Sequence, residues 1–111
     1  MKRLTKAFLY SLDGLRAAFR DEPAFRLELL LCAILIPAAF FVTPDATQRA
    51  LLIATLLLVL VTELLNSAIE ATIDRISEQH HPLAKKAKDC GSAAVLVAIG
   101  LAVVIWVVIL L

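Results

Sequence analysis

Residues 50–69 read ALLIATLLLVLVTELLNSAI, an apolar run that contains a single acid, Glu63. A helix of these 20 residues is long enough to cross the hydrocarbon core of a bilayer, so the run predicts a membrane span. A carboxylate inside a span is costly in lipid, so Glu63 must face other helices, water or a bound cation. Membrane insertion therefore decides the fold, and Glu63 is the first candidate for a functional residue.

Two other runs predict further spans. Residues 90–111 contain no charged residue and form the clearest span. Residues 27–43 form a third, if Glu28 lies at the interface and the helix continues through Pro37. With 61% apolar residues and a mean hydropathy of +0.90, an ordinary soluble domain is excluded. We expect one all-α integral membrane domain over residues 1–111, with no separate soluble catalytic module.

The N-terminal segment, residues 1–26, is patterned differently. Its apolar residues recur at steps of three and four, which predicts an amphipathic helix on the membrane surface: Leu4, Phe8, Leu12, Leu15 and Phe19. Pro23 restricts Glu22 to extended geometry and is itself a favoured first residue of a new helix.

The basic residues predict the orientation. Six of them precede the first span, one lies between the first two spans, and four lie between the second and third. The positive-inside rule then places the N-terminal segment and the second loop in the cytoplasm, and the C-terminus outside. The formal net charge of +1 excludes a polycationic nucleic-acid binder.

A polar stripe follows the helix that carries Glu63, because spacings of three, four and four put these residues on one face: Glu63, Asn66, Glu70 and Asp74. Glu70 and Asp74, together with Glu22, offer the hard oxygen ligands that Mg²⁺ prefers when it carries substrate phosphates. The second loop adds lysines for phosphate oxygens, among them Lys88 beside Asp89. Carboxylates for a metal and lysines for phosphates indicate phosphoryl transfer.

Several other sites are absent from the sequence. With glycine only at positions 14, 91 and 100, there is no GxxxxGK[ST] or GxGxxG loop, and there is no HRD or DFG element. A soluble kinase architecture is therefore excluded. The adjacent His80 and His81 lack the spacing for shared zinc ligation.

Three groups of residues together resemble the bacterial integral-membrane diacylglycerol kinases, the prokaryotic family of these enzymes. The first group is the run Glu63-Leu64-Leu65-Asn66-Ser67-Ala68-Ile69-Glu70-Ala71 with Asp74-Arg75, and the second is Ala87-Lys88-Asp89 with Gly91-Ser92-Ala93-Ala94-Val95. The third lies upstream, at Gly14-Leu15-Arg16-Ala17-Ala18-Phe19 and Glu22-Pro23-Ala24-Phe25-Arg26. The resemblance covers nearly the whole chain.

The resemblance implies a homotrimer of three-span subunits in the bacterial inner membrane, with its active site on the cytoplasmic side and its C-terminus in the periplasm. Such an enzyme transfers the γ-phosphoryl group of MgATP to the primary hydroxyl of 1,2-diacylglycerol and forms phosphatidic acid. Carried over by motif, Glu63 is the general base, Asn66 supports it, and Glu22 and Glu70 hold Mg²⁺. The resemblance also implies two longer sets. ATP contacts are Arg3, Tyr10, Glu22, Glu70, His81, Lys88 and Asp89, and lipid contacts are Arg3, Ser11, Arg16, Phe25, Glu28, Glu63, Ser92 and Trp106.

Two alternatives stay open on the sequence. A kinase of the same fold could phosphorylate undecaprenol instead of diacylglycerol. A small proton-coupled membrane transporter, with Glu63 as its proton-exchanging site, belongs to a different class. The transporter leaves the carboxylate and lysine cluster at the cytoplasmic face unexplained.

Overall fold

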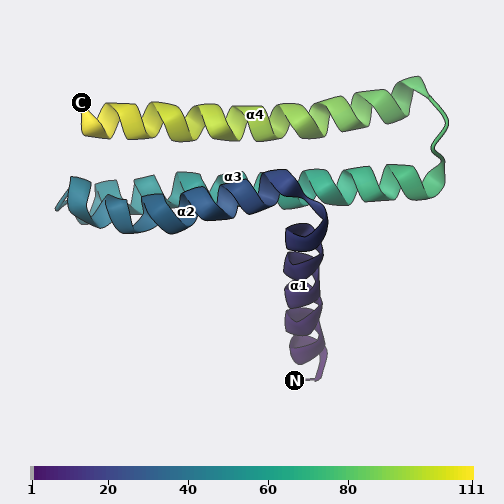
Figure 1. The fold of residues 1–111 in the computed structure, drawn as a ribbon, viewed down its shortest axis with the longest axis horizontal. Helices are drawn as coiled ribbons and strands as arrows, with labels where there is room; N and C mark the ends of the chain where they lie inside the picture. The colour runs from purple at the N-terminus through teal and green to yellow at the C-terminus, as the bar shows by residue number, and fades with distance from the viewer. Residues whose placement is uncertain (1) are drawn as a thin grey trace.

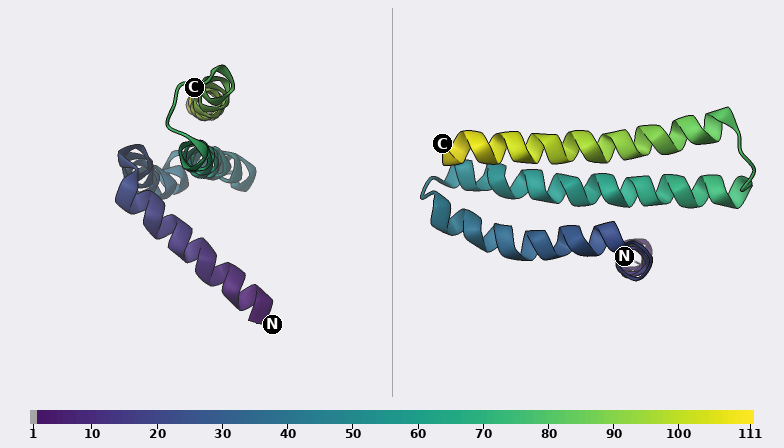
Figure 2. Two further views of the ribbon diagram at one scale, coloured as in Figure 1. Left: turned by 90° about the vertical axis from the view of Figure 1, so that its right-hand side faces the viewer. Right: turned by 45° about the horizontal axis from the view of Figure 1, so that its top comes forward.

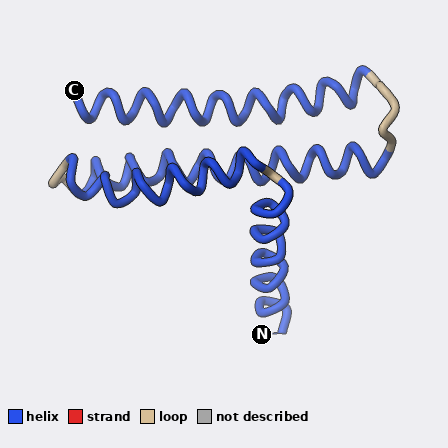
Figure 3. The backbone as a smooth tube through the Cα atoms, in the orientation of Figure 1, coloured by secondary structure: helices blue, strands red, loops and turns tan. Residues whose placement is uncertain are grey.

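The computed structural model describes residues 2–111, which form four helices and no strand (Figures 1 and 3). They are α1 (Lys2–Asp21), α2 (Pro23–Val42), α3 (Ala46–Ile76) and α4 (Pro82–Leu110). Helices α2, α3 and α4 are each long and apolar enough to cross a membrane. The all-α class and the three predicted spans are therefore confirmed.

Helix α3 is the middle helix of the three, with α2 packed on one side and α4 on another (Figure 2). At 31 and 29 residues, α3 and α4 exceed the roughly 20 residues that a span requires. Both are longer than α2 at the end joined by the loop over residues 77–81, and this is where the charged residues of the two helices gather. At that end α3 and α4 therefore form a charged pair of helices that extends past the first residue of α2.

Helices α2 and α3 are held antiparallel by a short turn. The Asp45 side chain accepts a hydrogen bond of 3.0 Å from the backbone N–H of Gln48 and so caps α3. Farther along, the buried Cys32 thiol donates a weak hydrogen bond of 3.9 Å to the carbonyl oxygen of Leu56, which marks where the two helices meet. Helix α2 continues through Pro37, as its span requires. In this register the start of α2 lies level with the polar stripe of α3.

Small residues on α4 let it approach α3 closely. Gly91, Ala98 and Ala102 are the buried residues of α4, and their spacing of seven and four puts them on one face. At the far end of the pair, Trp106 Nε1 donates a 3.3 Å hydrogen bond to the carbonyl oxygen of Leu52. Because the two helices lie so close, Gly91 and Lys88 of α4 reach Asn66 and Asp74 of the polar stripe.

Helix α1 runs crosswise to the other three (Figure 1), and most of its large apolar side chains are exposed, as a helix on a membrane surface requires. It ends at Asp21, before residue 26, because Glu22 is extended (φ −116°, ψ 102°) and Pro23 begins α2. The guanidinium of Arg26 donates to the carbonyl oxygens of Phe19 (2.7 Å) and Arg20 (3.0 Å). These bonds satisfy carbonyls at the end of α1 and fix the bend between the two helices.

Candidate functional site

The centre of the site is a group of carboxylates from two helices and the bend between α1 and α2. Glu63 on α3 is 7% exposed and lies within electrostatic range of Glu22, in the bend, and of Glu70, two turns along α3. Glu28 of α2 in turn interacts with Glu63. The four carboxylates repel one another, so the arrangement favours a bound cation or proton uptake.

Asn66 lies within this group and is 9% exposed. Its Nδ2 donates a 3.2 Å hydrogen bond to Glu70 Oε1, so it orients Glu70. Its Oδ1 and the Oε1 of Glu28 are both buried without a hydrogen-bond partner among the residues that the structure describes. Such orphaned acceptors are costly in a folded chain and are found where a ligand supplies the missing donor or charge.

The donor set fits a metal that arrives with a substrate better than a resident metal cage. Within residues 2–111, no three His, Cys, Asp or Glu side chains are grouped closely enough to hold an ion alone. Glu22 and Glu70 are half-buried hard-oxygen donors that both face Glu63. Two carboxylates are the number that Mg²⁺ needs when phosphates and water complete its coordination.

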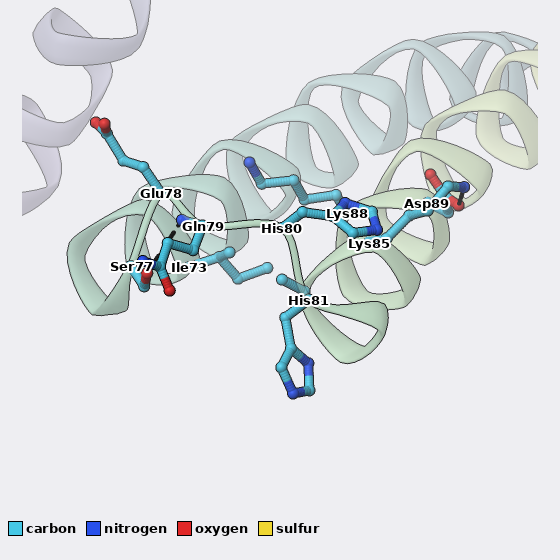
Figure 4. Close-up of a pocket in the computed structure, with 10 residues that line it drawn as sticks. Ile73, Ser77, Glu78, Gln79, His80, His81, Lys85, Lys88 and Asp89 are labelled. Atoms are coloured by element: carbon cyan, nitrogen blue, oxygen red, sulfur yellow. Dashed lines mark hydrogen bonds and ion pairs between the residues drawn. The ribbon is translucent and has the colours of Figure 1, made fainter.

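A second feature is a pocket of about 350 Å³ where α3, the 77–81 loop and α4 meet (Figure 4). His81, Lys88 and Asp89, three of the residues expected at the nucleotide, line it together. Lys88 Nζ donates to Asp74 Oδ1 across the two helices at 2.8 Å, and Lys85 donates to Asp89 at 2.6 Å. The pocket therefore presents ammonium groups already fixed by neighbouring acids.

Lys88 connects this pocket with the carboxylate group. Its hydrogen bond to Asp74 raises the pKa of the ammonium, and the nearby charges of Glu70 and Glu78 also raise it. The side chain therefore stays cationic at neutral pH, within reach of both the loop pocket and Glu70. This is the arrangement required of a group that binds phosphate oxygens beside a metal.

His81 has a structural part in the same loop. Its Nδ1 accepts a 3.1 Å hydrogen bond from the N–H of Leu83, so the imidazole caps the start of α4. In Figure 4 its ring points away from Lys88 and Asp89.

A hollow of about 570 Å³ separates the second half of α1 from α3. Ser11 and Glu22 line it with small and apolar residues of both helices, and Ser67 of α3 adds a second hydroxyl. Mostly apolar walls with two hydroxyls and two carboxylates, those of Asp21 and Glu22, suit a lipid headgroup that carries a free hydroxyl. Its α3 wall begins at Leu64, the residue that follows Glu63 in the chain.

The other residues expected at the lipid or the nucleotide are spread over the molecule. Arg3, Tyr10 and Arg16 are exposed on α1, and Ser92 is exposed on α4. Phe25 is 1% exposed, within the bundle. Trp106 lies at the opposite end of α4 from the loop pocket, bound to the carbonyl of Leu52. One chain therefore brings together the carboxylates, Asn66 and the Lys88 pocket, but not these residues.

Sequence reasoning named three further residues but did not predict the contacts by which they shape the site. Asp74 was visible as a member of the stripe, but its partner Lys88 lies 14 residues away and on another helix. Arg26 gave no signal beyond its charge. Gly91 could have been noticed as a glycine inside a helix, directly after the Lys88-Asp89 pair, where it lowers helix propensity without an evident turn.

Comparison with known proteins agrees with this arrangement. Residues 9–110 match the family model described as prokaryotic diacylglycerol kinase. The diacylglycerol kinase of Pseudomonas aeruginosa is 55% identical over 111 residues, which are 100% of this chain and 90% of that protein. That of Escherichia coli K12 is 48% identical over 108 residues, 97% of this chain and 88% of the relative. That of Helicobacter pylori J99 is 44% identical over 105 residues, covering 95% and 82%. This chain belongs to the prokaryotic diacylglycerol kinase family.

Proposed function

We propose that this chain, a diacylglycerol kinase by family, transfers the γ-phosphoryl group of ATP to the primary hydroxyl of 1,2-diacylglycerol and so forms phosphatidic acid. One observation carries the proposal. The buried Glu63 interacts with Glu22 and Glu70, a carboxylate pair suited to a metal. Glu22 also lines the hollow suited to a lipid headgroup, and Glu70 lies within electrostatic range of Lys88.

Glu63 is the general base in this proposal. It accepts the proton of the lipid hydroxyl, which becomes the nucleophile, as the bond to the γ-phosphorus forms and the bond to ADP breaks. Because phosphoryl transfer has a loose transition state, the proton moves late and a carboxylate is a sufficient base. Asn66 supports the site by orienting Glu70 through its 3.2 Å hydrogen bond.

The nucleotide binds where Lys88 and the loop pocket meet the carboxylates. Glu22 and Glu70 hold Mg²⁺, which supplies charge neutralisation of the phosphates when it is bound. Lys88 contacts phosphate oxygens, and Asp89 and His81 position the nucleotide from the pocket. Arg3 and Tyr10 of α1 complete the nucleotide contacts.

The lipid enters from the bilayer along α1 and reaches Glu63 through the hollow lined by Ser11. Arg16 and Glu28 contact its polar head, and Phe25 faces the start of its chains. Two lipid contacts lie farther off along α4, at Ser92 and Trp106, and Arg3 adds one from α1. An entry path at membrane level explains why the acceptor hydroxyl need not leave the bilayer.

The active enzyme is a homotrimer in the bacterial inner membrane. Three spans of one chain leave the acidic face of α3 partly open, and a neighbouring copy can close it. The N-terminal helix and the active site face the cytoplasm, where ATP is available, and the C-terminus is periplasmic, as the distribution of basic residues indicates.

A micelle assay with radiolabelled ATP tests the proposal. The purified protein is offered diacylglycerol and undecaprenol side by side, with and without Mg²⁺. We expect Mg²⁺-dependent transfer to diacylglycerol in clear preference to undecaprenol. Preferential transfer to undecaprenol would assign the acceptor to the other branch, and no transfer to either lipid would overturn the kinase function in favour of a transporter.

A further inference from the structure

Helices α3 and α4 come closest where Gly91 faces Asn66. A Cβ atom placed on Gly91 would lie 2.2 Å from Asn66 Oδ1 and 3.2 Å from its Cγ. Real side chains do not tolerate the first of these distances, so any residue but glycine would displace something. The other two glycines differ, because a Cβ at Gly14 or Gly100 would meet nothing within 4 Å.

The group that would give way is the Asn66 amide. The end of a side chain rotates at far lower cost than the backbone of a packed helix shifts. Asn66 is 9% exposed, and its Nδ2 donates the 3.2 Å hydrogen bond to Glu70 Oε1. Its Oδ1 is turned toward the α4 backbone and has no partner among the described residues.

We propose that Gly91 is a positioning residue for phosphoryl transfer. By lacking a side chain, it leaves room for Asn66 Oδ1 against α4 and so holds the amide in the orientation that donates to Glu70. An alanine at position 91 removes this room, rotates the amide and leaves Glu70 without its donor.

The inference rests on the proposed roles of Glu70 and Asn66, although the close contact itself does not. It concerns the metal side of the site more than the nucleotide side. Lys88 is held separately by its 2.8 Å bond to Asp74, so rotation of the Asn66 amide leaves that bond in place. A selective effect on metal dependence therefore separates positioning from general disruption of α4.

The first test compares Gly91→Ala with Gly100→Ala in the full-length protein in mixed micelles. Both changes add one methyl group to α4 and improve helix propensity equally. We expect G91A to lower kcat by at least about tenfold and to raise the Mg²⁺ concentration for half-maximal activity, with a smaller change in KM for ATP. G100A should match the unchanged protein. Circular dichroism during heating, which needs no turnover, should show a lower midpoint for G91A alone.

A second variant isolates the contact. Asn66→Ala removes Oδ1 and Cγ, and the remaining Asn66 Cβ lies 3.7 Å from the added Cβ, an ordinary contact. The double variant should therefore match N66A in activity, and its thermal midpoint should be no lower than that of N66A, because the clash is gone and alanine favours the helix.

Each other outcome decides a separate point. If G91A keeps activity within about threefold while N66A is impaired, Gly91 is not a positioning residue and the proposed site stands. If the losses of G91A and N66A add in the double variant, Gly91 acts through packing elsewhere and the inference is wrong. If N66A itself is fully active, the proposed role of Asn66 fails, whatever G91A does.

Discussion

Replacing Glu63 by glutamine is the most direct test of the chemistry. The change keeps the shape of the side chain and removes its charge and its ability to accept the hydroxyl proton. Glu63 is 7% exposed, so bulk water has little access to replace it as a base. The substitution therefore separates proton acceptance from packing.

The expected loss follows from what a positioned base contributes. General-base catalysis is worth about 10²–10⁴ in rate, which corresponds to about 3–5 kcal/mol of activation free energy. Glu28 is the remaining carboxylate within electrostatic range of Glu63 that has no proposed metal role, so it is the group that could supply residual activity. We expect Glu63→Gln to lower kcat about 10³-fold. Adding Glu28→Gln should lower the remaining activity further.

Stability should move in the opposite direction. Glu63 is repelled by its neighbours Glu22 and Glu70, and a neutral glutamine relieves that repulsion. Glu63→Gln should therefore unfold at the same temperature as the unchanged protein or at a higher one. Loss of activity with retained or increased stability is typical of a catalytic group.

The assay measures initial rates in mixed micelles at saturating lipid, together with ATP affinity by equilibrium dialysis and unfolding by circular dichroism. ATP affinity should be unchanged within about threefold, because the base does not hold the nucleotide. Turnover within about tenfold of the unchanged protein, equivalent to roughly 1.4 kcal/mol, would refute the assignment of Glu63 as the base. A fall in unfolding temperature would show instead that the carboxylate stabilises the fold.

Three more perturbations test separate parts of the structure. Lys88→Ala should raise KM for ATP by about tenfold or more at every pH. In the unchanged protein, KM for ATP should stay flat from about pH 7 to pH 9, because the bond to Asp74 raises the pKa of Lys88 and its charge is lost only above the ordinary lysine value of about 10.4. A rise in KM below pH 9 would contradict the proposed role of the Lys88 charge. Arg26→Ala should cost about 1 kcal/mol through its two lost bonds to the end of α1. It should also speed cleavage at the bend by chymotrypsin, whose sites at Phe19 and Phe25 the change leaves intact; digestion at the unchanged rate would mean that the bend is held by other contacts. Trp106→Phe should lose the 3.3 Å bond to the carbonyl of Leu52, which should cost about 1 kcal/mol in thermal unfolding. It should also raise KM for diacylglycerol, because Trp106 is a proposed lipid contact, and an unchanged KM would remove it from that set.

Local patterns were sufficient for the fold and the family. Length and hydropathy predicted the three spans, since a helix that crosses lipid must satisfy its backbone internally and show it as a long apolar run. Pro23 predicted the break after α1, because proline constrains the residue before it. The motif around Glu63 and Glu70 indicated the family, which the comparisons confirm.

Contacts between helices were beyond the reach of these patterns. Nothing local shows that Glu28 faces Glu63, because the two lie on different helices and the register between α2 and α3 depends on packing. The hydrogen bond of Asn66 connects residues four apart and could have been anticipated, although the partner could equally have been Glu63.

The sequence by itself determined that this chain enters a membrane, where its spans and surface helix lie, and which side chains share the polar face of α3. These properties follow from helix periodicity and from the cost of burying charge, which act along the chain. The tertiary structure alone decided that Lys88 pairs with Asp74, that Arg26 fixes the bend beside Glu22, and that the room left by Gly91 holds Asn66. Those contacts depend on how closely whole helices pack, and packing joins residues that the sequence keeps far apart.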